Sequence, residues 1–244
     1  MESKSFQRFR SKIQYIHQHQ QMVDASLKVL NTKLNSATDK TKDITQELKI
    51  NKTDYGKLNQ PINEKDRLVS YSRSKLAEYI ILELFGAFSI YMRDITDEMY
   101  QKDPIKIVGK VNSGSTLTYV EIIKLGSFNK IREKIVNEIF RKFENERSTI
   151  KLVDKILSHT DVVVPDSLKD TALMYLEMRH LFIHNKGKAD EKFKNKYGEN
   201  VKLKTGDKLP TNFKVVSKAI DTVNRFAKSI DEQLISKNNI DKLN

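Results

Sequence analysis

Long stretches of this sequence carry apolar residues at steps of three or four, which is the spacing of one face of an α-helix. The clearest stretches are residues 3–34, 64–100, 128–146 and 211–236, with shorter ones at 118–125 and 149–158. All four prolines lie between these stretches, at positions 61, 104, 165 and 210. Because proline breaks the interior of a helix, their placement supports the same partition. The sequence therefore predicts an all-α fold, a bundle of long helices.

The remaining segments complete the outline of the chain. Residues 35–49 are polar and are expected to extend the first helix. Residues 104–119 predict a short irregular or hairpin insertion. Gly86, inside a long helical stretch, is expected to mark a close approach of two helices. We divide the chain into an N-terminal helical extension, residues 1–60, and a helical domain, residues 61–244.

One further helix, within residues 165–187, has an unusual composition. Asp166 is expected to be its N-cap, and Gly187 is expected to end it. Nearly every position from 172 to 183 is apolar, so this helix belongs inside the fold or in a subunit interface. Four polar residues are set into its second half: Glu177, Arg179, His180 and His184. Unpaired charge is costly in apolar surroundings, so these side chains must be paired, near the helix end or in a cleft.

Two structural interpretations of these polar residues stay open. In the first, Arg179 pairs with Glu177 or another acid, and the histidines are satisfied structural residues. In the second, Glu177, His180 and His184 bind a metal, because positions i, i+3 and i+7 share one face of a helix. A zinc site would need further ligands from elsewhere in the chain, and we expect no metal here.

The segment from Arg179 to His184 resembles the R-x(4–6)-H motif of HEPN domains, all-helical proteins of which many cleave RNA. Residues 82–95 are similar to the early HEPN helix that packs against the motif helix, and the resemblance covers about residues 64–236. His180 stands where many catalytic members have Asn. The resemblance implies a HEPN-type helical bundle with an extra N-terminal helix.

The resemblance also implies a reaction, metal-independent RNA cleavage in which the 2′-OH attacks the adjacent phosphate without a cofactor. His184 would be the general acid or base, since imidazole exchanges protons near neutral pH. Arg179 would hold the phosphate and stabilise its charge in the transition state. His180 would help to position the phosphate.

Helix geometry constrains this site. Five residues along a helix correspond to about 7.5 Å of rise and about 140° of rotation, so Arg179 and His184 do not share a face. Two copies related by a two-fold axis could bring both residues into one cleft. We therefore predict a homodimer that buries the apolar motif helix.

The charge of the chain favours a polyanionic partner. The 44 Lys and Arg exceed the 32 Asp and Glu, giving a net charge of +12. Residues 186–208 hold 8 Lys against 4 acidic residues, and this basic loop begins at the candidate site. We expect RNA contacts from the residues that follow the motif: Asn185, Lys186, Lys188, Lys192 and Lys194.

Composition limits the remaining classes of function. With no cysteine the chain forms no disulfides and performs no thiolate chemistry. No apolar run approaches the ~20 residues of a membrane span, and the polar start predicts no signal peptide, so we expect no membrane partner and a cytoplasmic location. The resemblance implies a toxin or anti-phage effector, controlled by an antitoxin or another regulatory protein. The alternative is a non-catalytic helical module for RNA binding or protein interaction.

Overall fold

The structure is a computed structural model that describes residues 1–103, 116–145, 151, 153–154, 157 and 160–243. Across these residues it is built from α-helices and two 3₁₀ turns, without a β-strand, so the predicted all-α class is confirmed. The helices are α1 (Lys4–Asn35), α2 (Ile44–Leu48), α3 (Lys65–Lys102), α5 (Tyr119–Leu125), α6 (Phe128–Asn145), α8 (Asp166–His184), α9 (Glu191–Val201) and α10 (Phe213–Ser236).

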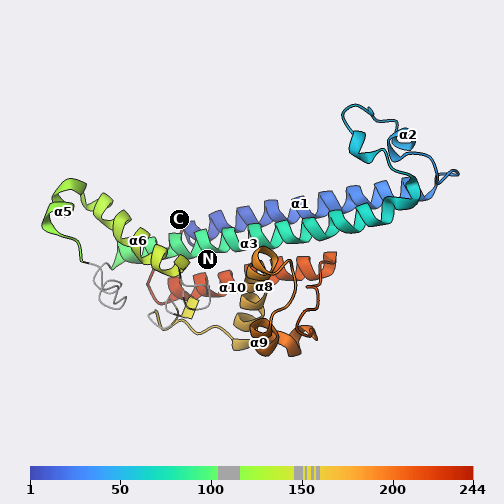
Figure 1. Cartoon of the computed structure of the whole chain (residues 1–244). Coiled ribbons are helices and arrows are strands. Elements are labelled where there is room, and N and C mark those ends of the chain that lie inside the picture. The colour runs from blue at the N-terminus through green and yellow to red at the C-terminus, as the bar shows by residue number, and fades with distance from the viewer. Residues whose placement is uncertain (104–115, 146–150, 152, 155–156, 158–159, 244) are drawn as a thin grey trace.

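The two longest helices, α1 and α3, lie side by side and form the backbone of the molecule (Figure 1). They run in opposite directions, so the start of α1 meets the end of α3. The Ser5 hydroxyl donates a hydrogen bond to Glu98, while Asp24, near the other end of α1, pairs with Arg73. Apolar residues at helical spacing explain the pairing, because each helix buries one apolar stripe against the other.

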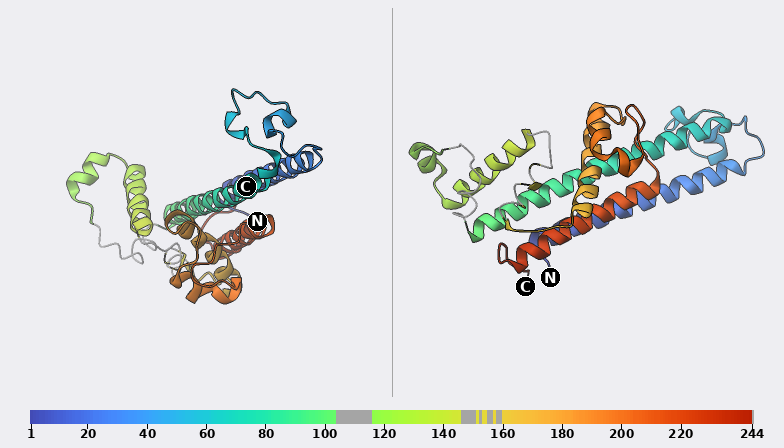
Figure 2. Two further views of the ribbon diagram at one scale, coloured as in Figure 1. Left: turned by 45° about the vertical axis from the view of Figure 1, so that its right-hand side comes forward. Right: turned by 90° about the horizontal axis from the view of Figure 1, so that it is seen from below.

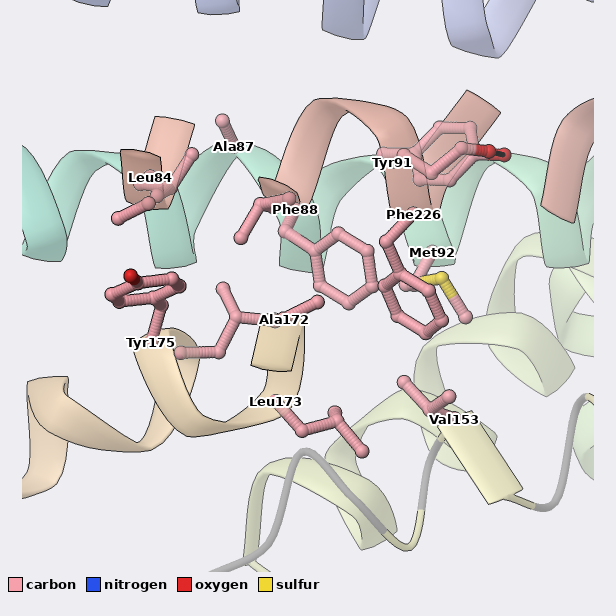
Figure 3. Close-up of a cluster of buried hydrophobic side chains, with 14 of the residues drawn as sticks. Leu84, Ala87, Phe88, Tyr91, Met92, Val153, Ala172, Leu173, Tyr175 and Phe226 are labelled. Atoms are coloured by element: carbon pink, nitrogen blue, oxygen red, sulfur yellow. Dashed lines mark hydrogen bonds between the residues drawn. The ribbon is translucent and has the colours of Figure 1, made fainter. Parts of the chain in front are cut away.

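Helices α8 and α10 cover the underside of this pair and complete the main core (Figures 1 and 3). Phe88 of α3 stacks on Phe226 of α10, with ring centroids 5.7 Å apart. The buried Tyr91 hydroxyl donates a hydrogen bond to the Ala227 carbonyl at 3.0 Å. Ala172 and Leu173 bring α8 into the same cluster.

The first turn of α1 is fixed to α10 by a buried polar contact. The Ser3 amide and hydroxyl donate hydrogen bonds to the two oxygens of Asp231, at 2.9 and 2.5 Å. The same hydroxyl accepts a hydrogen bond from the Phe6 amide, so Ser3 is also the N-cap of α1. Residues 228 positions apart are thereby joined.

The far end of the α1–α3 pair carries a small separate cluster, which we call the tip. Its buried apolar residues are Leu34, Ala37, Ile44 and Ile62. Two backbone hydrogen bonds, Ile44 N to Gln60 O and Ile62 N to Lys42 O, close the chain around them. At the opposite end α5 and α6 extend away from α3 (Figure 2), held by the ion pair between Arg132 and Asp97.

The expected extension of the first helix through residues 35–49 is wrong, because α1 ends at Asn35. The Lys40 ammonium donates to the carbonyls of Leu34 and Asn35, and the Thr41 amide and hydroxyl bond to Asp39. These local bonds offer the backbone an alternative to further helix.

Two smaller expectations also fail. A Cβ added at Gly86 would meet nothing within 4 Å, so this glycine marks no close helix approach. Helix α8 begins at Asp166 with Pro165 as its N-cap, and no side chain caps it.

The other predicted segments are only partly described. Residues 104–115 of the predicted insertion lie outside the described part, and residues 116–118 have no regular structure before α5 begins. Of the helix predicted at 149–158, residues 151, 153–154 and 157 are described and are helical. The division at residue 60 stays a prediction. The structure places Phe6, Phe9, Ile13 and Ile16 of α1 in the same core as α3 and α10.

Candidate functional site on helix α8

The apolar side of α8 is already covered within one chain. Its buried residues are Ala172, Leu173, Met174, Tyr175, Leu176, Met178 and Leu181. Helix α8 packs against α3 and α10, and Figure 3 shows Ala172 and Tyr175 facing α3 and Leu173 beside Val153. A second copy is therefore not needed to bury this helix, and a dimer would have to use other surfaces.

The end of α8 is fixed by a tight turn. Helix α8 runs unbroken to His184, after which Lys186 and Gly187 adopt positive φ angles of 52° and 70°. The Gly187 amide donates to the Leu181 carbonyl at 2.9 Å, as in a Schellman motif. A Cβ at Gly187 would lie 3.1 Å from the Phe182 ring. Both this close contact and the positive φ angle therefore favour glycine at this position.

Arg179 lies on the side of α8 that faces α3. Its guanidinium carbon is 4.3 Å from the centroid of the Phe85 ring, a cation–π contact that leaves Arg179 half-buried. No carboxylate among the described residues forms an ion pair with Arg179, so the suggested pairing with Glu177 is not observed. A guanidinium held by its flat face keeps its N–H edge for an anion.

His180 and His184 lie together on another side of α8. Both are exposed, and their ring centroids are 4.7 Å apart at an interplanar angle of 44°. Because α8 is continuous, about 140° of rotation separates Arg179 from His184. One chain therefore brings the two histidines together, while Arg179 is turned away from His184 toward Phe85 of α3.

Glu177 lies one turn before His180 and faces α9. Burial raises the pKa of the Glu177 carboxyl, while Lys196 opposes the rise. Burial and the neighbouring Glu177 carboxylate raise the pKa of the Tyr197 hydroxyl. Across the described part of the chain, no three His, Asp or Glu side chains are close enough together to hold a metal ion. Glu177, His180 and His184 thus supply no ready metal centre.

The segment expected to be a basic loop contains a helix, α9. Asp190 caps it by accepting a hydrogen bond from the Phe193 amide at 2.8 Å. Phe193 and Tyr197, four residues apart, are buried and attach α9 to the main core. The Asp190 cap and this i, i+4 aromatic pair were the signals in the sequence for the helix.

The five residues expected to contact RNA have different environments. Lys186, Lys188, Lys192 and Lys194 are exposed around the end of α8 and along α9. The Asn185 side-chain amide instead donates to the Lys188 carbonyl at 2.7 Å and holds the turn. Backbone hydrogen bonds tie this turn to residues 206–209, for example Leu209 N to Gly187 O at 2.8 Å. The four lysines therefore lie on the exposed surface of a segment, the turn and α9, that these bonds and the buried aromatic residues of α9 hold in place.

Sequence reasoning missed two partners of the site. Phe85 of α3 contacts Arg179, and Tyr197 of α9 interacts with Glu177. Because these partners lie on other helices, the spacing of residues along α8 could not reveal them.

Comparisons with protein-family models, with curated proteins and with solved structures find no match. The described helices include none that is long and apolar enough to cross a membrane.

Proposed function

We propose that this protein is a metal-independent endoribonuclease of HEPN type. The observation that carries the proposal is the pair of exposed imidazoles, His180 and His184, which are in contact at the end of α8, just before the turn that carries the exposed Lys186 and Lys188. Acid–base cleavage of RNA needs one group that accepts a proton and one that donates a proton. The contact places His180 and His184 so that one ring can act as the base and the other as the acid.

The reaction assigned to this site is transfer of a phosphoester within the RNA. The neutral imidazole removes the proton of a 2′-OH, and that oxygen attacks the adjacent phosphorus. The bond to the 5′-oxygen breaks, and this oxygen takes a proton from the charged imidazole. The products are a 2′,3′-cyclic phosphate and a 5′-OH, and the two histidines end with their protonation states exchanged.

In this proposal Arg179 of one chain acts on the RNA bound at the histidines of a second chain. It lies away from His184 on the same helix, so a two-fold pair must supply the arginine of one copy to the histidines of the other. Its guanidinium would then stabilise charge on the phosphate oxygens in the transition state. Lys186, Lys188, Lys192 and Lys194 would neutralise the flanking phosphates.

A cleavage assay in the presence of EDTA tests the proposal. Wild type should cut RNA and leave 2′,3′-cyclic phosphates, whereas His184→Ala and Arg179→Ala should lose at least about a hundredfold in rate. His180→Ala should lose a comparable factor. His17→Ala, a histidine on α1, is the matched control and should retain full rate. Cleavage that survives His184→Ala, or that stops in EDTA, would reject this mechanism.

The second candidate is a non-catalytic module that binds RNA or a protein. The contact of Arg179 with Phe85 favours it, because the arginine then has a packing role without chemistry. This candidate predicts RNA binding without cleavage, weakened and made less salt-dependent by Lys192→Glu and Lys194→Glu.

A biological role follows from the first candidate. A ribonuclease of this kind acts as a toxin or anti-phage effector and needs an antitoxin or other regulatory partner. Expression in a host cell should halt growth, and Arg179→Ala should relieve the arrest.

A further inference from the structure

A stripe along the outer side of α1 has the composition of an interface. Tyr15, Met22 and Val29 follow one another at seven-residue steps and are 70%, 66% and 70% exposed. Seven residues are nearly two helical turns, so the three side chains share one face. The buried side of α1, with Ile13, Ile16 and Gln20, is opposite. We call the exposed face the α1 ridge; it comprises Tyr15, Gln18, Met22, Ala25, Ser26 and Val29.

The ridge is depleted of charge in a chain with 31% charged residues. Residues 13–27 contain no Lys, Arg or Glu, and their one acid, Asp24, is buried. Interface centres are likewise depleted of charge and enriched in Tyr and Met.

Four of the cations that border the ridge form ion pairs within the chain. Their ion pairs are Arg8–Asp94, Arg10–Glu2, Lys12–Glu83 and Lys28–Asp24. Such a surface attracts neither a polyanion nor an acidic protein, and it suits a partner that is itself neutral there.

We infer that the α1 ridge binds the α1 ridge of a second copy, antiparallel and centred on Met22. In this register Met22 meets Met22 of the second copy, and Tyr15 meets Val29. Gln18, which is long, meets Ser26, which is short, so the side chains interdigitate. The exposed cations Lys12 and Lys33 face Thr32 and Ser11. In a parallel arrangement each of these lysines would instead lie opposite the same lysine of the second chain, and the like charges would repel.

This interface is distinct from the one that the ribonuclease proposal requires. The ridge is an exposed face of α1, whereas α8 packs against α3 and α10 below the α1–α3 pair (Figure 1). Pairing through α1 therefore leaves His180 and His184 exposed in both copies. A chain that uses both two-fold interfaces forms an assembly of two or more ridge pairs, the smallest being a tetramer.

The mass of the assembly in solution tests the inference. At a protein concentration of about 10 µM, a value within the range of dissociation constants of specific protein pairs, the wild-type assembly should contain an even number of chains. Met22→Glu should halve this mass, because two carboxylates would meet at the two-fold axis. Val163→Glu, at a site 75% exposed and far from the ridge in sequence, is the control and should not change the mass. An identical mass for wild type and Met22→Glu would overturn the inference.

Disulfide cross-linking tests the register independently of stability. The chain has no cysteine, so Met22→Cys introduces a single thiol. Under mild oxidation it should give a covalent dimer, since the two Cα atoms must come within about 7 Å. Tyr15→Cys alone should not cross-link, but a mixture of Tyr15→Cys and Val29→Cys chains should. Cross-linking of Tyr15→Cys with itself, or of Met22→Cys no faster than Val163→Cys, would overturn the register.

Discussion

At the residue scale, Asp231 joins the start of the chain to its last long helix. It is fully buried and accepts two hydrogen bonds from Ser3. Asp231→Ala would leave a buried amide and a buried hydroxyl without their acceptor, and such groups cost about 1–3 kcal/mol each. We expect the free energy of unfolding, measured in urea, to fall by about 2–4 kcal/mol.

Ser3→Ala provides the matched comparison. It removes the hydroxyl, and with it both the N-cap bond to Phe6 and one of the two bonds to Asp231, but leaves the Ser3 amide bonded to Asp231. The expected loss is about 1–2 kcal/mol. An Asp231→Ala variant no less stable than Ser3→Ala would contradict this account of the contact.

Glu177 makes folding stability depend on pH. Burial raises the pKa of its carboxyl above the ordinary value for glutamate, so the folded chain holds this proton more tightly than the unfolded chain. Stability from this group is therefore greatest at low pH and falls as pH rises through the raised pKa. Glu177→Gln imitates the protonated side chain and should unfold at higher urea than wild type at pH 7, but not at pH 4. Glu232→Gln, at an exposed position, is the control and should change stability little at either pH. If Glu177→Gln raised the stability equally at pH 7 and pH 4, burial of the Glu177 carboxylate would not be the cause.

The sequence predicted some of these residue environments. Helix geometry alone separated Arg179 from His184, and the structure has them on one continuous helix. The contact of Arg179 with Phe85 was not predictable, because it depends on how α8 crosses α3. Nor was the bond from Ser3 to Asp231, which joins positions 228 residues apart.

At the scale of single helices, two glycines should respond to alanine in opposite ways. Gly86 lies inside α3 with open space around its Cβ position, so Gly86→Ala should stabilise the protein by about 0.5–1 kcal/mol through helix propensity. Gly187 has φ 70° and faces Phe182, so Gly187→Ala should destabilise it by about 1–2 kcal/mol. Urea unfolding of both variants measures the difference. If Gly86→Ala destabilised the protein, this result would support the close helix approach that the sequence predicted at Gly86.

Helix periodicity located α1, α3 and α10 to within about two residues at each end, because their apolar stripes are long. It failed for residues 35–49, where polar side chains bond to the local backbone. It also failed for α9, where the many lysines obscured two buried aromatic residues. Short elements depend on caps and tertiary contacts more than on pattern.

At the scale of the whole molecule, the tip and the main core should open separately. The tip buries four apolar residues, whereas the main core runs through α1, α3, α8 and α10. Hydrogen exchange should show the amides of Ile44 and Ile62 opening at a lower free energy than those of central α3. Ile62→Ala should lower tip protection by about 2–4 kcal/mol and leave central α3 unchanged. A uniform loss in both regions would show that they open as one unit.

The sequence predicted the all-α class of the whole molecule but not the arrangement of its helices. Each apolar stripe shows that a helix must be covered, without showing by which partner. The main core depends on such choices, since Phe88 of α3 meets Phe226 of α10.

Because the chain is made from its N-terminus, the apolar surface of the α1–α3 pair stays uncovered for a time during synthesis. Both helices have left the ribosome roughly 110 residues before α10 begins, yet α10 covers their aromatic underside. At usual translation rates this gap lasts on the order of 5–20 s. Throughout it Phe88 and Tyr91 lack the contacts that α10 will provide. The nascent chain therefore presents an apolar surface to chaperones that bind such surfaces at the ribosome exit, and α10 covers this surface only when it has been made.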